Sequence, residues 1–146
     1  MSNTNYFSPQ EIAAYDMRKR QADESIGRAI AGLTNQRNYL TQEYGVGRSR
    51  AGEQYARNFR QLPASFARRG VLRSGIYGSA LQQQDMGYQQ RMSDMERQYQ
   101  EAMRRLSEQQ GNLEYVRGAT MEQIDFEKLA RQQAMASDLA RLMGMA

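Results

Sequence analysis

The feature that most constrains this chain is an apolar pattern that keeps helical spacing along almost all of its 146 residues. Between residues 15 and 62 the apolar positions are separated by threes and fours, which is the period of one face of an α-helix. No segment alternates apolar and polar residues over the length of a strand, and the only prolines are Pro9 and Pro63. The sequence therefore predicts an all-α protein without β-sheet.

A strong start signal opens the first predicted helix. Ser8 and Glu11 have the spacing of a capping box, and Pro9 between them suits the first helical position. Phe7 precedes the cap, where its ring can pack against the helix as a hydrophobic staple. The polar residues before this signal are expected to form a flexible amino-terminal arm, residues 1–8.

The first helix is expected to span residues 9–62. Pro63 is expected to end it, because the residue before a proline is pushed out of the α region. The weak stretch of this helix is the glycine-rich segment 45–52, since each interior glycine destabilises a helix by up to about 1 kcal/mol relative to alanine. The pattern leaves open whether residues 45–49 form a break or a site of close helix contact.

A bend is predicted over residues 63–74. Gly70 is placed to end a short helical turn in the left-handed conformation, with Phe66 and Val71 as the touching residues of a Schellman ending. Ser74 is a natural cap for the next helix. The residues expected to set the bend are Pro63, Phe66, Gly70, Val71, Ser74 and Gly75.

The second helix, expected over residues 75–143, carries an eleven-residue recurrence. Tyr77, Tyr88 and Tyr99 form one row of it. Eleven residues in three helical turns give about 3.67 residues per turn, which predicts a nearly straight or slightly right-handed supercoil. The residues of the predicted helix-packing seam are Tyr77, Leu81, Tyr88, Met92, Met95, Tyr99, Met103 and Leu106.

Two long helices joined by a short turn predict an elongated antiparallel helical hairpin that forms a single unit, residues 1–146. Such a hairpin has a narrow apolar seam and little interior. Its seam is filled by tyrosine and methionine, which are adaptable residues that suit contacts with other chains. We therefore expect a coiled-coil homo-oligomer, in which copies of the chain or another protein complete the core.

Positive charge gathers around the predicted bend. The whole chain has 20 Lys and Arg residues against 16 Asp and Glu, but segment 48–73 has seven arginines against Glu53 alone. Guanidinium groups pair bidentately with phosphate or carboxylate, so this segment is expected to contact nucleic acid or an acidic protein surface. Solvated arginines, or arginines that neutralise glutamates of an adjacent copy, are the alternatives. The candidate contact residues are Arg48, Arg50, Arg57, Arg60, Arg68, Arg69 and Arg73.

Composition argues against an enzyme. The chain has no cysteine and no histidine, which removes disulfides, zinc-finger sites and cysteine or histidine nucleophiles. Gly47 and Gly52 have the spacing of a phosphate-binding loop, but Glu53 and Gln54 stand where that loop requires Lys and Ser or Thr. We expect no catalytic residue, no metal site and no cofactor.

The sequence also shows no membrane-spanning or export signal. No apolar run approaches the roughly 20 residues of a membrane-spanning helix. Residues 1–5 lack the basic and apolar regions of a signal peptide. We therefore expect no membrane span, and either an intracellular product or a particle assembled inside a cell.

Segment 62–81, LPASFARRGVLRSGIYGSAL, contains an Arg-Gly-aliphatic-x-x-Ser-Gly pattern between helices rich in Gln, Arg and Tyr. This pattern resembles small virion structural proteins of tailed bacteriophages, either portal- or neck-associated or internal to the virion. The resemblance implies a non-enzymatic component of the particle, such as a head–tail connector or portal-associated protein, assembled in the host cytoplasm. It implies as partners other copies of the chain and portal or connector proteins, with the basic bend facing either packaged DNA or an acidic patch of the connector. A nonspecific nucleic-acid-associated helical protein and a cytosolic coiled-coil adaptor stay open as alternatives.

Overall fold

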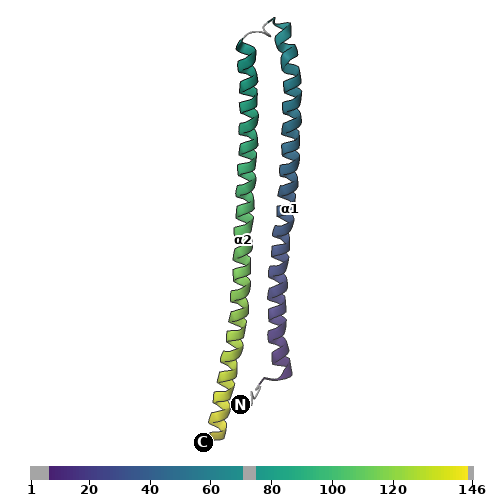
Figure 1. Ribbon diagram of the computed structural model, residues 1–146. Coiled ribbons are helices and arrows are strands. Elements are labelled where there is room, and N and C mark those ends of the chain that lie inside the picture. The colour runs from purple at the N-terminus through teal and green to yellow at the C-terminus, as the bar shows by residue number, and fades with distance from the viewer. Residues whose placement is uncertain (1–6, 71–74, 145–146) are drawn as a thin grey trace, which may run out of the picture. The chain divides into compact units, whose positions relative to one another are not determined.

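The computed structural model describes residues 7–70 and 75–144, and two α-helices account for nearly all of them. Helix α1 spans Pro9–Arg68 and helix α2 spans Gly75–Gly144 (Figure 1). The described residues contain no strand. The fold-class prediction is confirmed, because the protein is all-α, with two long helices packed against each other across a short turn.

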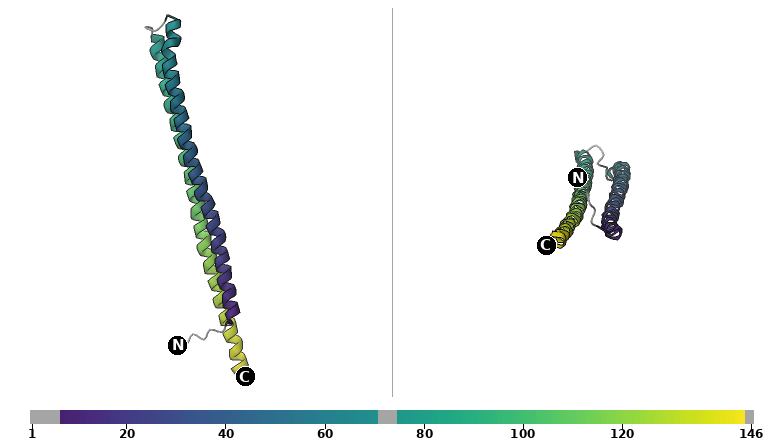
Figure 2. Two further views of the ribbon diagram at one scale, coloured as in Figure 1. Left: turned by 90° about the vertical axis from the view of Figure 1, so that its right-hand side faces the viewer. Right: turned by 90° about the horizontal axis from the view of Figure 1, so that it is seen from below.

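Contacts divide the chain into two compact units. The bend unit is Thr34–Ser107, and the terminal unit combines Met1–Leu33 with Glu108–Ala146. Both helices contribute to both units. Within each unit a segment of α1 lies beside a segment of α2 that runs in the opposite direction (Figures 1 and 2).

The predicted capping box forms at the start of α1. The Glu11 amide donates to Ser8 Oγ at 3.3 Å, and the Ser8 amide donates to a carboxylate oxygen of Glu11 at 3.1 Å. Phe7 is buried, and its ring centroid lies 5.7 Å from that of Tyr15. Phe7 and Ser8 are therefore held against α1, which corrects the expectation of a flexible arm over residues 1–8. The rest of that arm lies outside the described residues.

The prediction that the first helix ends before Pro63 is wrong, because α1 continues through the proline to Arg68. A stop is expected because proline pushes the preceding residue out of the α region, and proline also has no amide hydrogen for the carbonyl four residues earlier. Tertiary contact outweighs that loss here. Phe66, only 8% exposed, meets the ring of Tyr77 edge-on at a centroid distance of 5.3 Å, so the last turns of α1 stay on α2.

Gly70 has the left-handed conformation predicted for it, but it follows the end of α1 and not a separate short turn. Gly70 has a φ of 69°, in the left-handed region, and its amide donates to the Ala67 carbonyl at 3.0 Å. This bond is the inner hydrogen bond of a Schellman ending. The bend therefore begins after this turn and not at the proline. Gly75 is the first residue of α2, whereas Val71 and Ser74 lie outside the described residues.

The break considered near residues 45–49 does not occur, because α1 is continuous there. Two glycines of this stretch lie where side chains of α2 come close. A Cβ atom at Gly47 would lie 3.0 Å from Met95 Cε, and one at Gly52 would lie 3.7 Å from the Tyr88 hydroxyl. These glycines are therefore sites of close helix contact.

Candidate interaction surfaces

Three aromatic pairs join the two helices of the bend unit. They are Phe66 with Tyr77, Tyr55 with Tyr88 and Tyr44 with Tyr99, at centroid distances of 5.3, 4.4 and 4.4 Å. From each pair to the next, the residue number falls by eleven on α1 and rises by eleven on α2. Eleven residues complete three turns, or about 16 Å of helix, so successive pairs lie on the same side of each helix.

Only the α2 side of this aromatic seam is predicted above. The α1 partners Tyr44 and Tyr55 belong to the apolar pattern of residues 15–62, and Phe66 belongs to the predicted bend. Their assignment to the seam was missed, although their eleven-residue spacing is the signal that could have given it. The structure leaves none of the eight predicted seam residues exposed. Those half-buried or buried residues are Tyr77, Leu81, Tyr88, Met92, Met95, Tyr99, Met103 and Leu106.

Tyrosine hydroxyls find polar partners at the margin of the same seam. Tyr55 donates a hydrogen bond to the Asp85 carboxylate, and this bond is the main cause that raises the pKa of Tyr55. The hydroxyls of Tyr99 and Thr41 lie 3.0 Å apart. These tyrosines thus give an apolar ring to the seam while their hydroxyl groups stay hydrogen-bonded.

Ion pairs join the two helices of the terminal unit. They are Arg18 with Glu127, Lys19 with Asp125, Asp23 with Arg117, and Glu11 with Arg131. The side chains are partly exposed, so each pair contributes about 0–1 kcal/mol. Ile124 is the buried apolar side chain of α2 in this unit. The terminal unit therefore combines a small apolar contact with charge pairing, whereas the bend unit is joined by rings.

The structure places five of the seven candidate arginines on the surface of α1 and exposes Arg69 just after its end, whereas Arg73 lies outside the described residues. The Arg48 guanidinium lies 5.6 Å from the centroid of the Tyr44 ring. The five other exposed arginines form no ion pair with any residue of 7–70 or 75–144. Those five are Arg50, Arg57, Arg60, Arg68 and Arg69.

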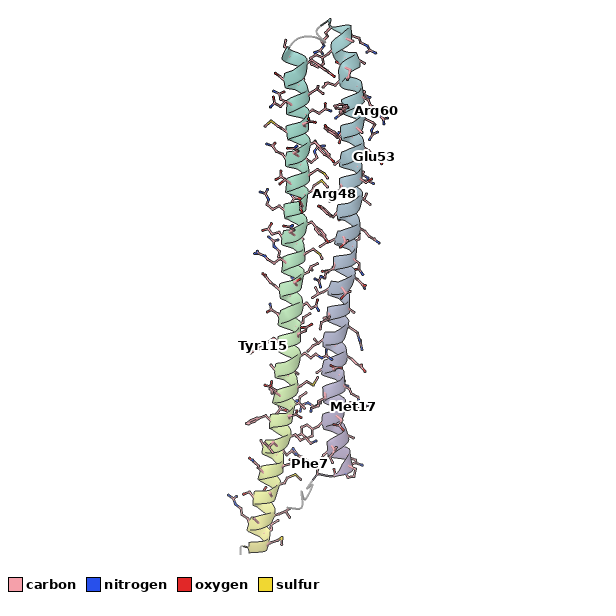
Figure 3. The ribbon with its side chains drawn as sticks, in the orientation of Figure 1. Phe7, Met17, Arg48, Glu53, Arg60 and Tyr115 are labelled. Atoms are coloured by element: carbon pink, nitrogen blue, oxygen red, sulfur yellow. The ribbon has the colours of Figure 1, made fainter. Side chains whose placement is uncertain are left out.

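Four of these arginines share the side of α1 opposite the seam. Arg68, for example, follows the buried Phe66 by two residues, which is about 200° around the helix. Figure 3 shows Arg60 and Glu53 on the side of α1 that faces away from α2. We name this surface the arginine face and define it as Arg50, Arg57, Arg60 and Arg68.

The end of the arginine face borders an open hollow. Its volume is about 570 Å³, and Arg68, Arg69, Gln61 and Ser65 are among its lining residues. The bend unit as a whole has 12 arginines against 6 acidic residues, whereas the terminal unit has 8 basic against 10 acidic residues. The bend unit is therefore chemically suited to bind phosphate or carboxylate groups.

Large apolar side chains stay exposed on both helices. Among the described residues, five apolar side chains are buried and thirteen large ones are exposed, so many large apolar side chains are not covered within the chain. Tyr115 and Phe126 of α2 are 78% and 71% exposed. Tyr115 lies on the side of α2 that faces away from α1 (Figure 3).

Comparison of the chain with protein-family models, with curated proteins and with solved structures finds no match. Neither helix, over its described residues, has an apolar stretch that could cross a bilayer. The part of the chain that the structure describes also contains no group of three acidic side chains placed to hold a metal ion.

Proposed function

We propose that this chain is a non-enzymatic structural component of a tailed-phage particle. In this proposal several copies assemble by helix packing, at the portal or neck region or inside the head. The observation that carries it is the imbalance between five buried apolar side chains and thirteen large exposed ones among the described residues. A pair of helices covers only one side of each helix, so other copies or virion proteins would cover the remainder. The choice of a phage particle rests on the resemblance of segment 62–81.

The arginine face supplies the polar contacts in this proposal. Its guanidinium groups are exposed, and no ion pair with a described residue occupies them. They could pair bidentately with phosphates of packaged DNA or with carboxylates of a portal or connector protein. Either contact would orient the bend unit toward the partner while the apolar surfaces join the copies.

Mass spectrometry of purified particles tests the proposal. We expect the chain at a fixed stoichiometry relative to the portal protein in particles of the phage that encodes it. An abundant host cytosolic protein, measured in the same sample, controls for carry-over. Recovery of the chain only in the lysate, and not in the particles, would contradict the virion role and favour a cytosolic adaptor.

The unpaired arginines also favour a second candidate, nonspecific association with nucleic acid. Replacing Arg50, Arg57 and Arg68 with alanine should weaken DNA binding and reduce the slope of log affinity against log salt by up to about 3. A matched control changes three exposed arginines that each pair with an acid of their own helix: Arg28, Arg97 and Arg105. Equal losses of affinity in the two triple variants would count against a role for the arginine face.

A further inference from the structure

The hollow at the end of α1 is built by a short run of residues beside the last arginine of the arginine face. Its lining residues on α1 are Gln61, Ala64, Ser65 and Arg68. Their spacing of three and four residues places them on one side of the helix. The two middle residues are short, whereas Gln61 and Arg68 on either side are long, so the surface is hollowed between them. Arg69 follows α1 and also lines this hollow, which we name the end hollow.

Every polar side chain described in the lining of the end hollow can donate a hydrogen bond. Arg68 and Arg69 have guanidinium groups, which only donate and stay charged. Neither arginine forms an ion pair with a described residue. Ser65 and Gln61 each add an uncharged donor, and none of the described lining residues is acidic. The end hollow is therefore suited to bind an anion.

The sequence around the end hollow contains no carboxylate that could fill this role. Residues 54–84 include five arginines and no Asp or Glu. The nearest acidic residue of α1 is Glu53, eight residues before Gln61, which is about 12 Å along the helix axis. The two arginines of the hollow are therefore left to pair with an anion of another molecule.

The end of a helix disfavours an anion, but here the two arginines outweigh that effect. The carbonyl groups that end a helix are equivalent to about half a negative charge. Arg68 lies in the last turn of α1 and Arg69 follows it, so two positive charges stand against that half charge. One arginine is enough to complement the helix end, and the second exceeds that need. The end hollow thus keeps a net charge of about +1.5.

We propose that the end hollow binds a phosphate monoester, the group at a phosphorylated end of a nucleic-acid strand. Such a group has a charge of about −1.5 to −2 at pH 7 and three strong acceptor oxygens, which match two guanidinium groups with uncharged donors beside them. A carboxylate or an internal phosphodiester has a single charge and fewer free oxygens, so it matches the hollow less well.

The position of the end hollow favours a strand as the source of this group. From the hollow, a bound strand can continue along the arginine face past Arg60 and Arg57 to Arg50, where single arginines meet its internal phosphates. The inference rests on the proposed contact between the arginine face and nucleic acid, and it names the group bound at the end of that face.

Fluorescence anisotropy with two oligonucleotides tests the inference. Both have the same sequence and an internal fluorophore, but one has a phosphate at each end where the other has hydroxyl groups. At neutral pH and about 50 mM salt, we expect the phosphorylated strand to bind about 10-fold more tightly, because two exposed ion pairs add a modest amount. This preference should shrink below about pH 6, where the monoester gains a proton.

Two substitutions separate the end hollow from the arginine face. Ala64→Leu fills the hollow without a change of charge, and Arg69→Gln removes a charge that is not part of the arginine face. Each should remove most of the preference for the phosphorylated strand, while the affinity for the unphosphorylated strand stays within about 3-fold. Ala67→Leu is the matched control, because Ala67 is exposed, lies about 100° around the helix from Arg68 and is not among the described lining residues. Circular dichroism checks that every variant keeps its helices.

A preference that both substitutions remove and Ala67→Leu retains supports the inference. Equal affinity of the wild-type chain for the two strands, or a preference that survives Ala64→Leu, would overturn it. A nucleoside monophosphate that binds as tightly as the phosphorylated strand would overturn the assignment to a strand end. Failure of both strands to bind would overturn the contact of the arginine face with nucleic acid and this inference with it, whereas equal binding of both strands leaves that contact standing.

Discussion

Replacing Pro63 with alanine should stabilise the protein. Because α1 runs through Pro63, the substitution supplies an amide for the Phe59 carbonyl and removes the clash between that carbonyl and the proline ring. If the helix stopped before Pro63 and a new one began there, the proline would occupy a favoured first helical position. The sign of the stability change therefore distinguishes a continuous helix from an interrupted one.

The expected size of this effect follows from opposing contributions. A proline in a helix interior costs about 3 kcal/mol relative to alanine. Replacing proline with alanine also raises the entropy of the unfolded chain, which lowers the stability by about 0.4–1 kcal/mol. Pro63 also lies in the last two turns of α1, where a hydrogen bond is easily broken by fraying. We therefore expect a net stabilisation of about 1–2 kcal/mol.

Urea unfolding followed by far-ultraviolet circular dichroism measures the change. With a slope near 2 kcal/mol per molar urea, the midpoint should rise by about 0.5–1 M. Pro9→Ala is the matched control, because Pro9 is the first residue of α1 and the substitution there should give no stabilisation. A neutral or destabilising Pro63→Ala substitution with an unchanged slope would refute the reasoning.

Four further substitutions test local features of the fold. Gly45→Ala should stabilise the protein by up to about 1 kcal/mol, because no atom lies within 4 Å of the added Cβ. Gly47→Ala should stabilise it less, because its Cβ would lie 3.0 Å from Met95 Cε. Equal urea midpoints for the two variants would argue against the close contact. The pKa of Glu11 lies below its ordinary value of 4.5, chiefly because the carboxylate accepts the backbone hydrogen bond of the cap. The melting temperature of the wild type should therefore fall as the pH drops below 4.5, and that of Glu11→Gln should fall less. The pKa of Tyr55 lies above its ordinary value of 10.0 because its hydroxyl bonds a carboxylate, so stability should fall as pH rises beyond that value; an alkaline profile unchanged in Tyr55→Phe would contradict the bond.

Local chemistry made much of the fold predictable. The capping box of Ser8 and Glu11 and the left-handed Gly70 each depend on a few neighbouring residues, and both signals are visible in the sequence. The two-helix fold follows from long stretches in which apolar residues keep helical spacing and do not alternate with polar residues as in a strand. The α2 side of the seam was also predictable, because a row such as Tyr77 and Tyr88 repeats every eleven residues.

Contacts between distant residues were not predictable in this way. The continuation of α1 past Pro63 depends on the ring of Phe66 meeting Tyr77, and local propensity alone favours a stop. The close contact of Met95 with Gly47 likewise depends on which side chain of α2 lies opposite that glycine.

Which arginines find partners also depends on the register between the helices. In the terminal unit, that register brings acidic residues of one helix to basic residues of the other, as with Arg18 and Glu127. On the arginine face, Arg57 and Arg68 lie on the side opposite the seam, where the described part of α2 offers no carboxylate. Charge counts along the sequence show how many groups of each sign exist, but the pairing requires the structure.

In the proposed assembly, other copies of the chain complete this pair of helices. The most direct test is the melting temperature of the purified chain as a function of its concentration, with the molecular mass measured in parallel. Association of the folded state should make both quantities rise with concentration, by mass action. A melting temperature and a monomeric mass that stay constant over a dilution of about 100-fold would contradict the account.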